Sequence, residues 1–181
     1  MRILTVFVVA TIIWSGATAQ EVKTEITTPV SDSDLKPNTD TVPSWYALSG
    51  QFQKIMIVRC KYRTDILACL EQFVQKNAIR NAVILSAIGS VRGYHYHIVG
   101  SREFPTKNIF VRDTASPADI TTMNGYIING RIHAHILFAN SQKAFGGHLE
   151  TGTSVYTFAI ITLGILNDGI DLHTVDEKNY R

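Results

Sequence analysis

The chain has 181 residues, of which 45% are hydrophobic and 18% are charged, so it is long enough for one domain with a hydrophobic core. Its net charge is only +2, whereas a nucleic-acid-binding protein usually carries a basic surplus that neutralises phosphates. The composition therefore excludes a low-complexity or membrane-embedded chain, and the charge disfavours DNA binding.

Residues 1–19 have the pattern of a cleaved export signal. A short basic start is followed by an apolar run from Ile3 to Trp14, which is shorter than the roughly 20 residues that span a bilayer. Ala17-Thr18-Ala19 then supplies the small-x-small site that a signal peptidase reads. We expect cleavage after Ala19 and a mature protein that is periplasmic or secreted, rather than one held by a membrane anchor.

The mature chain divides into a leader and a domain. Residues 20–43 are rich in Thr, Ser, Asp and Pro and nearly lack large apolar side chains, so they are predicted to be a flexible polar leader. Residues 44–181 are predicted to form a single domain.

The first elements of that domain are a strand and a helix. The β-branched run at 52–60 predicts a strand, and Thr64 or Asp65 is placed to cap a helix that runs to about Lys76. Cys60 would lie at the end of the strand and Cys69 on the buried side of the helix. The pair could form a disulfide in an exported protein, but without a wider cysteine framework we favour two unpaired thiols.

The rest of the chain is predicted to consist mainly of strands. Asn129-Gly130 is the strongest two-residue hairpin signal, Gly89-Ser90 is expected to end a buried strand, and residues 100–117 are expected to be a partly irregular connection. The sequence thus predicts an α+β fold, a largely antiparallel sheet with one principal helix. Its remaining strands are expected at 82–91, 94–99, 120–128, 131–139, 145–150 and 154–166.

Three histidines are the candidate metal ligands. His133 and His135 lie two apart on one strand, so their side chains share a face. His148 follows Gly146-Gly147, where missing side chains allow a close backbone approach. Three imidazoles with an open fourth position are the ligand set of a catalytic zinc. The alternative is three sheet histidines with ordinary hydrogen bonds.

Other polar residues near these histidines have weaker claims to a role. Glu150 shares the face of His148 and could act as a general base toward water in the fourth position, or orient a ligand histidine. Arg131 could hold a substrate carboxylate, or be merely solvated.

A second H-x-H, at residues 95 and 97, is expected to be a solvated strand face. His173 is expected at the surface, and Asp171 and Asp176 show no metal-loop spacing.

Two segments resemble the signature blocks of a known family. DILACLEQFVQKNAIRNAVILSAIGSV (65–91) and GRIHAHILFANSQKAFGGHLETGTSVYTFAII (130–161) resemble the PPC domain, the "plants and prokaryotes conserved" domain. The resemblance covers residues 45–175. It implies an α+β domain, typically trimeric, with a metal held by His133, His135 and His148. Their spacing is also similar to that of the zinc-binding histidines of α-acetolactate decarboxylase.

The chain departs from the plant members of that family in two places. They carry an AT-hook, a Gly-Arg-Pro core in a basic arm, whereas Gly130-Arg131 is followed by Ile132 within the predicted hairpin. The segment SPADITTMNG stands where their GRFEIL-like segment would be. Both departures weaken any transfer of DNA binding.

Three functions follow as hypotheses. The first is an exported zinc-dependent lyase or hydrolase acting on a small polar molecule. The second is a non-catalytic, metal-containing oligomeric module that binds a small ligand. The third, DNA binding, is disfavoured by the export signal and the near-neutral charge. The expected partners are a small-molecule ligand and further copies of the chain in a homotrimer.

Overall fold

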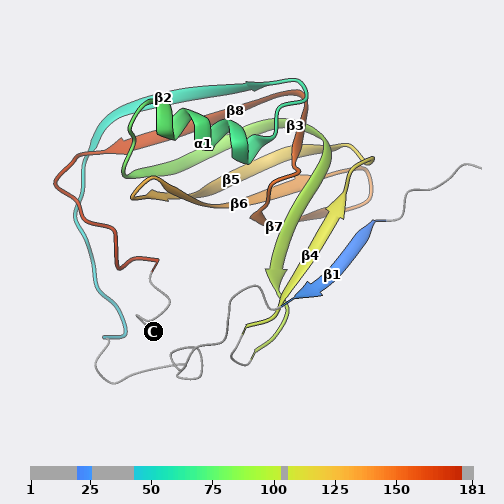
Figure 1. Cartoon of the computed structure of the whole chain (residues 1–181), viewed down its shortest axis with the longest axis horizontal. Helices are drawn as coiled ribbons and strands as arrows, with labels where there is room; N and C mark the ends of the chain where they lie inside the picture. The colour runs from blue at the N-terminus through green and yellow to red at the C-terminus, as the bar shows by residue number, and fades with distance from the viewer. Residues whose placement is uncertain (1–19, 26–42, 103–105, 177–181) are drawn as a thin grey trace, which may run out of the picture.

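A computed structural model of the chain describes residues 20–25, 43–102 and 106–176. The predicted export signal lies outside these residues, as does most of the predicted leader. The element bounds, in chain order and as labelled in Figure 1, are β1 (Glu21–Glu25), β2 (Phe52–Lys61), α1 (Ile66–Lys76), β3 (Ala82–Val99), β4 (Asn108–Asp113), β5 (Ala118–Ile128), β6 (Arg131–Ala139), β7 (Ala144–Leu149) and β8 (Ser154–Leu166).

The described strands form one antiparallel sheet. Its order is β1-β4-β3-β5-β6-β7, while β8 pairs with β3 and with β2. The long strand β3 pairs with β5 along its first half and with β7 near its end, so the pairings β3-β5-β6-β7 close into a ring. Figure 1 shows β3 curving strongly as it runs down to β4. The predicted α+β fold, a mostly antiparallel sheet with one helix, is confirmed.

The curvature of β3 explains one difference from the sequence prediction. Gly89 was expected to help end a strand, but β3 continues through it with a register shift. Its φ is +145°, and a Cβ there would overlap the carbonyl oxygen of Phe158. Glycine therefore lets the strand bend and stay paired, where another residue would be strained and would clash.

The hairpin between β5 and β6 forms as predicted. Both Asn129 and Gly130 have positive φ, 50° and 81°, as a type I′ turn requires. The turn is anchored because Asn129 donates its N–H to Oδ1 of Asn81 (3.0 Å).

Helix α1 packs on the inner face of the sheet, where it contacts β2, β6 and β8. As predicted, Asp65 caps it by accepting a hydrogen bond from the N–H of Ala68 (2.9 Å). Ile66, Leu70 and Val74 are buried at helical spacing. Within the described residues, no helix is long and apolar enough to cross a membrane.

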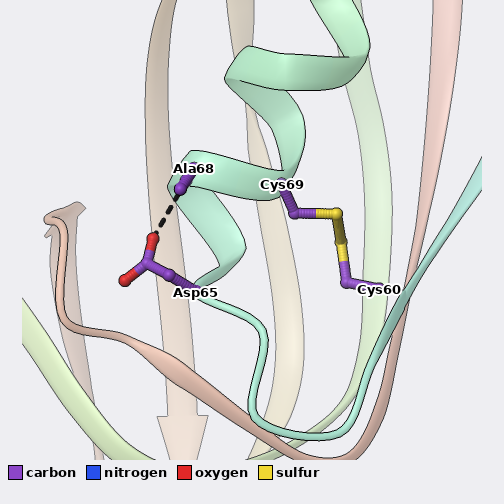
Figure 2. Close-up of a disulfide and its surroundings, with 4 residues drawn as sticks. All are labelled: Cys60, Asp65, Ala68 and Cys69. Carbon is purple, nitrogen blue, oxygen red and sulfur yellow. Dashed lines mark hydrogen bonds between the residues drawn. A yellow bond between two sulfur atoms is a disulfide. The ribbon is translucent and has the colours of Figure 1, made fainter.

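The expectation of two unpaired thiols is wrong. Cys60 and Cys69 form a disulfide, with Cα atoms 6.4 Å apart (Figure 2). The tight connection after β2 folds the first turns of α1 back over the end of that strand, which brings the two residues together. Closing so short a loop stabilises the fold by about 2–3 kcal/mol in the chain-entropy estimate.

Two further strands appear where the sequence predicted irregular chain. Strand β4 lies within the expected connection at 100–117 and pairs with the end of β3. Strand β1 lies within the expected flexible leader and pairs with β4. Both are short, and β1 is polar, so their hydrophobic periodicity is weak. Strand β4 forms because it pairs with the end of β3, and β1 forms because it pairs with the free edge of β4.

Alternation along β3, β6 and β7 decides what faces outward. Tyr94 and Tyr96 point inward and form an aromatic cluster with Phe138 and Phe145, in which the Tyr94 and Phe145 ring centroids are 4.7 Å apart. On each of these strands the alternate residues point to the outer face. That face therefore carries five histidines, His95, His97, His133, His135 and His148.

Candidate metal centre

Strand register brings the predicted ligand histidines together. His135 on β6 lies directly opposite His148 on β7, and His133 lies two residues earlier on the same face of β6. The ring centroid of His148 is 4.8 Å from that of His133 and 5.5 Å from that of His135. One nitrogen of each ring can be chosen so that the three lie within 4.8 Å of one another.

Two glycines allow this close packing. A Cβ at Gly146 would overlap the carbonyl oxygen of Ile136 on β6, and a Cβ at Gly147 would overlap that of His97 on β3. Strand β7 is therefore held closely between β6 and β3, and His148 is the residue directly after the two glycines. The close backbone approach predicted for this Gly-Gly pair is present in the structure.

His97 is a member of the cluster that the sequence did not reveal. It lies opposite His148 across the β3–β7 pairing, and the two rings stack with centroids 4.5 Å apart. Its side chain is 19% exposed, so the expectation of a solvated strand face is wrong at this position. His95 lies apart from the cluster, with Nδ1 2.7 Å from the carbonyl oxygen of Thr151.

Glu150, the predicted general base, contacts His97. Its Oε1 lies 2.6 Å from Nδ1 of His97. Because an ionised carboxylate only accepts hydrogen bonds, Nδ1 is the donor in this contact, and in the neutral form of the ring that leaves the lone pair on Nε2. Glu150, His97 and His148 form a second group of possible metal ligands, whose ligand atoms lie within 4.8 Å of one another.

Arg131 and His133 share an acidic partner. Oδ2 of Asp176 lies 2.8 Å from a guanidinium nitrogen of Arg131 and 3.0 Å from Nδ1 of His133. The arginine side chain is 67% exposed. The structure thus places Arg131 beside the cluster, with its charge partly balanced by Asp176, a residue whose spacing in the sequence does not indicate a role. Asp171 instead accepts the N–H of His173 in a local turn.

The cluster is suited to neutral imidazoles. Burial, followed by the neighbouring His97, His133 and His135, lowers the pKa of His148 to about 4. Burial and then the charges of His133 and His97 also lower the pKa of His135. At neutral pH both rings are therefore unprotonated and have a lone pair to donate. Neutral imidazole nitrogen is a ligand that zinc and related divalent transition metals bind well.

Carboxylates complete the surroundings of the histidines. Asp176 and Glu150 each fix the orientation of one ring through its Nδ1, in His133 and His97 respectively. Pairing of a ligand histidine with a carboxylate is common around protein-bound zinc, because it fixes the tautomer and makes the free nitrogen more basic. The donor set therefore fits a transition metal.

Solved structures similar to this chain share its fold. A plant- and prokaryote-conserved protein from Pyrococcus horikoshii has a TM-score of 0.56 and 17% identity, with 70% of this chain and 89% of that chain covered. A protein described as metal-containing, from Archaeoglobus fulgidus, has a TM-score of 0.54 and 23% identity, covering 67% and 86%. A candidate DNA-binding protein from Bacteroides thetaiotaomicron has a TM-score of 0.51 and 17% identity, covering 67% and 86%.

The family follows from the sequence comparison. No curated protein matches the chain. The family model of the Plants and Prokaryotes Conserved (PCC) domain matches residues 47–167, which include both segments that resemble the signature blocks. The chain therefore belongs to the Plants and Prokaryotes Conserved domain family.

Proposed function

We propose that this protein is an exported metal-binding member of its family, with zinc held by His133, His135 and His148. The observation that carries the proposal is the convergence of these three rings on the outer face, with the pKa of His148 lowered to about 4. The metal-containing description of the Archaeoglobus relative supports it. Three protein ligands leave a position for water or substrate, as in catalytic zinc sites.

The chemistry that we propose is lyase or hydrolase activity on a small molecule. A bound zinc ion would supply Lewis-acid polarisation of a substrate oxygen. Glu150 is the proposed general base, because one of its oxygens is fixed by His97 and the other can take a proton. Arg131 is the proposed contact for a substrate carboxylate, shared with Asp176.

A non-catalytic module that binds a ligand through its metal is the second candidate. The observation in its favour is the contact between Glu150 and His97, since a carboxylate that only orients a histidine makes the same hydrogen bond. DNA binding, suggested by the name of the Bacteroides relative, is the weakest candidate because the net charge is only +2.

The proposed location is outside the cytoplasm, and the proposed assembly is a trimer. The disulfide between Cys60 and Cys69 supports export, since disulfides persist mainly in oxidising compartments. Exposed apolar side chains on the outer face of β2 and β3 support self-association. These side chains are Ile55, Ile57, Leu85 and Ile88.

Zinc titration of the mature protein, started metal-free, tests the proposal. We expect zinc to raise the melting temperature, because it binds the folded state and not the unfolded chain. His135→Ala should lose this shift, whereas His95→Ala, which removes a histidine of the other H-x-H outside the cluster, should keep it. An equal shift in both variants would contradict the proposed ligands.

A further variant, Glu150→Gln, separates the enzyme from the binding module. On a substrate found by screening, Glu150→Gln should lower kcat by about 10²–10⁴-fold, the usual contribution of a general base. Its metal content should stay near normal. Full activity in Glu150→Gln would remove this residue from the mechanism and favour the binding module.

A further inference from the structure

An apolar pocket of about 430 Å³ lies on the outer face of the sheet. Its floor includes Val83 on β3 and Tyr126 on β5, and its walls come from the segments before β2 and after β8, with Leu48, Phe52 and Ile170 among them. None of the lining residues carries a charge. The volume is within the range of about 300–1,000 Å³ that small-molecule sites usually have.

Hydrogen bonds hold these walls in place. The hydroxyl of Tyr46 donates to Oγ1 of Thr174 (3.1 Å), which joins the two wall segments. The N–H of Asn167 donates to the carbonyl of Gln51 (3.1 Å), and the side-chain amide of Asn81 donates to the carbonyl of Ile170 (3.0 Å). The pocket is therefore formed before any ligand arrives, so that little ordering cost opposes binding.

The pocket adjoins the histidine cluster at two points. Tyr126, which lines the pocket, is the direct cross-strand partner of His133, and such partners on one face have Cβ atoms about 4.5–5.5 Å apart. Val175, which also lines the pocket, precedes Asp176, the carboxylate that contacts Nδ1 of His133. A single bound molecule can therefore contact the pocket and the histidine cluster at the same time.

We propose that the substrate is an amphiphilic small molecule, with a carbonyl or carboxylate head at the metal and an aromatic or branched aliphatic body in this pocket. This inference rests on the proposed metal site. It narrows the substrate class, because a wholly polar molecule would leave the apolar lining of the pocket exposed to water. Tyr126 would be the specificity-determining residue, since it separates the two halves of the site.

A pair of hydroxamic acids tests the inference on the zinc-loaded mature protein. Acetohydroxamate carries a zinc-chelating head alone, and 3-phenylpropanohydroxamate adds a phenyl ring on a two-carbon linker. Calorimetric titration should give the phenyl compound a Kd at least about tenfold lower, since apolar groups that fill such a pocket contribute that much or more.

Two variants locate the phenyl ring. Val83→Phe fills the floor of the pocket and should abolish the advantage of the phenyl compound while leaving the binding of acetohydroxamate unchanged. Gln72→Phe adds a ring on the exposed side of α1, outside the pocket lining and away from the exposed apolar face of β2 and β3, and should keep the advantage. If Val83→Phe does not fold, Tyr126→Ala, at an exposed position, should also reduce the advantage.

The outcomes separate this inference from the proposed function. If zinc and acetohydroxamate bind but the phenyl ring adds nothing, the inference is overturned and the metal site stands. The inference is also overturned if the advantage is unchanged in Val83→Phe, because the ring then lies elsewhere. If neither zinc nor acetohydroxamate binds, the proposed function fails, and the inference fails with it.

Discussion

Asp176 acts on the candidate site through His133. Its carboxylate accepts from Nδ1 of that ring and pairs with Arg131, so it fixes the tautomer that leaves Nε2 for a metal. Asp176→Asn should therefore weaken zinc binding by about 10–100-fold, measured by competition with a chelating indicator. The control is Asp171→Asn, whose carboxylate caps a local turn. Equal zinc affinities in the two variants would remove Asp176 from the site.

The partly buried His148 on β7 should make the metal-free protein acid-sensitive. The pKa of His148 is about 4 in the folded state, first because of burial and then because of the neighbouring histidines, and about 6.5 in an unfolded chain. Between these values the unfolded state binds more protons. The free energy of unfolding should therefore fall as the pH falls from about 6.5 to about 4.

Urea unfolding at several pH values measures this dependence. Carboxylates also contribute to acid unfolding, so the comparison is with His148→Gln, which cannot titrate. The variant should show a shallower fall over the same window. An identical pH dependence would mean that His148 titrates normally in the folded protein.

Only part of the cluster was accessible from the sequence. Alternation along one strand predicts that His133 and His135 share a face, and the Gly-Gly pair before His148 predicts a close approach. His97 joins the cluster only because the end of β3 pairs with β7, and Asp176 only because the chain after β8 returns to His133. Both are long-range contacts, and no local pattern encodes them.

The position of β7 depends on the absence of a side chain at Gly147. A Cβ there would overlap the carbonyl oxygen of His97, so Gly147→Ala should push β7 away from β3 and shift His148. We expect lower stability, by about 1–3 kcal/mol as for overpacking, together with weaker zinc binding. Gly169→Ala is the matched control, since a Cβ at that position has no atom within 4 Å. Unchanged zinc affinity in Gly147→Ala would show that the spacing of the strands is not critical.

Among the elements, the helix and the β5–β6 hairpin were predictable because capping and turn residues act locally. The disulfide was missed because two cysteines alone do not reveal that α1 folds back over β2. The edge strands β1 and β4 were missed for a related reason. Their pairing depends on the bend in β3, which follows from the conformation of Gly89 rather than from any hydrophobic period.

At the scale of the whole molecule, the exposed apolar face calls for a partner. Ile57 on β2 is 72% exposed and Ile88 on β3 is 56% exposed, and patches of this kind usually mark association surfaces. The mature protein should sediment with three times the mass of one chain. Ile57→Glu should shift it toward the monomer, whereas Gln75→Glu on the exposed side of α1 should not. A monomeric wild-type protein would contradict the proposed trimer.

The central claim, a transition metal held by three histidines, is tested most directly by elemental analysis of the mature protein purified without chelators. The account predicts close to one zinc ion per chain in the wild type and in His95→Ala, and a large loss in His135→Ala, because two remaining imidazoles hold zinc far less firmly than three. Negligible metal in the wild-type protein, or equal metal content in the two variants, would contradict it.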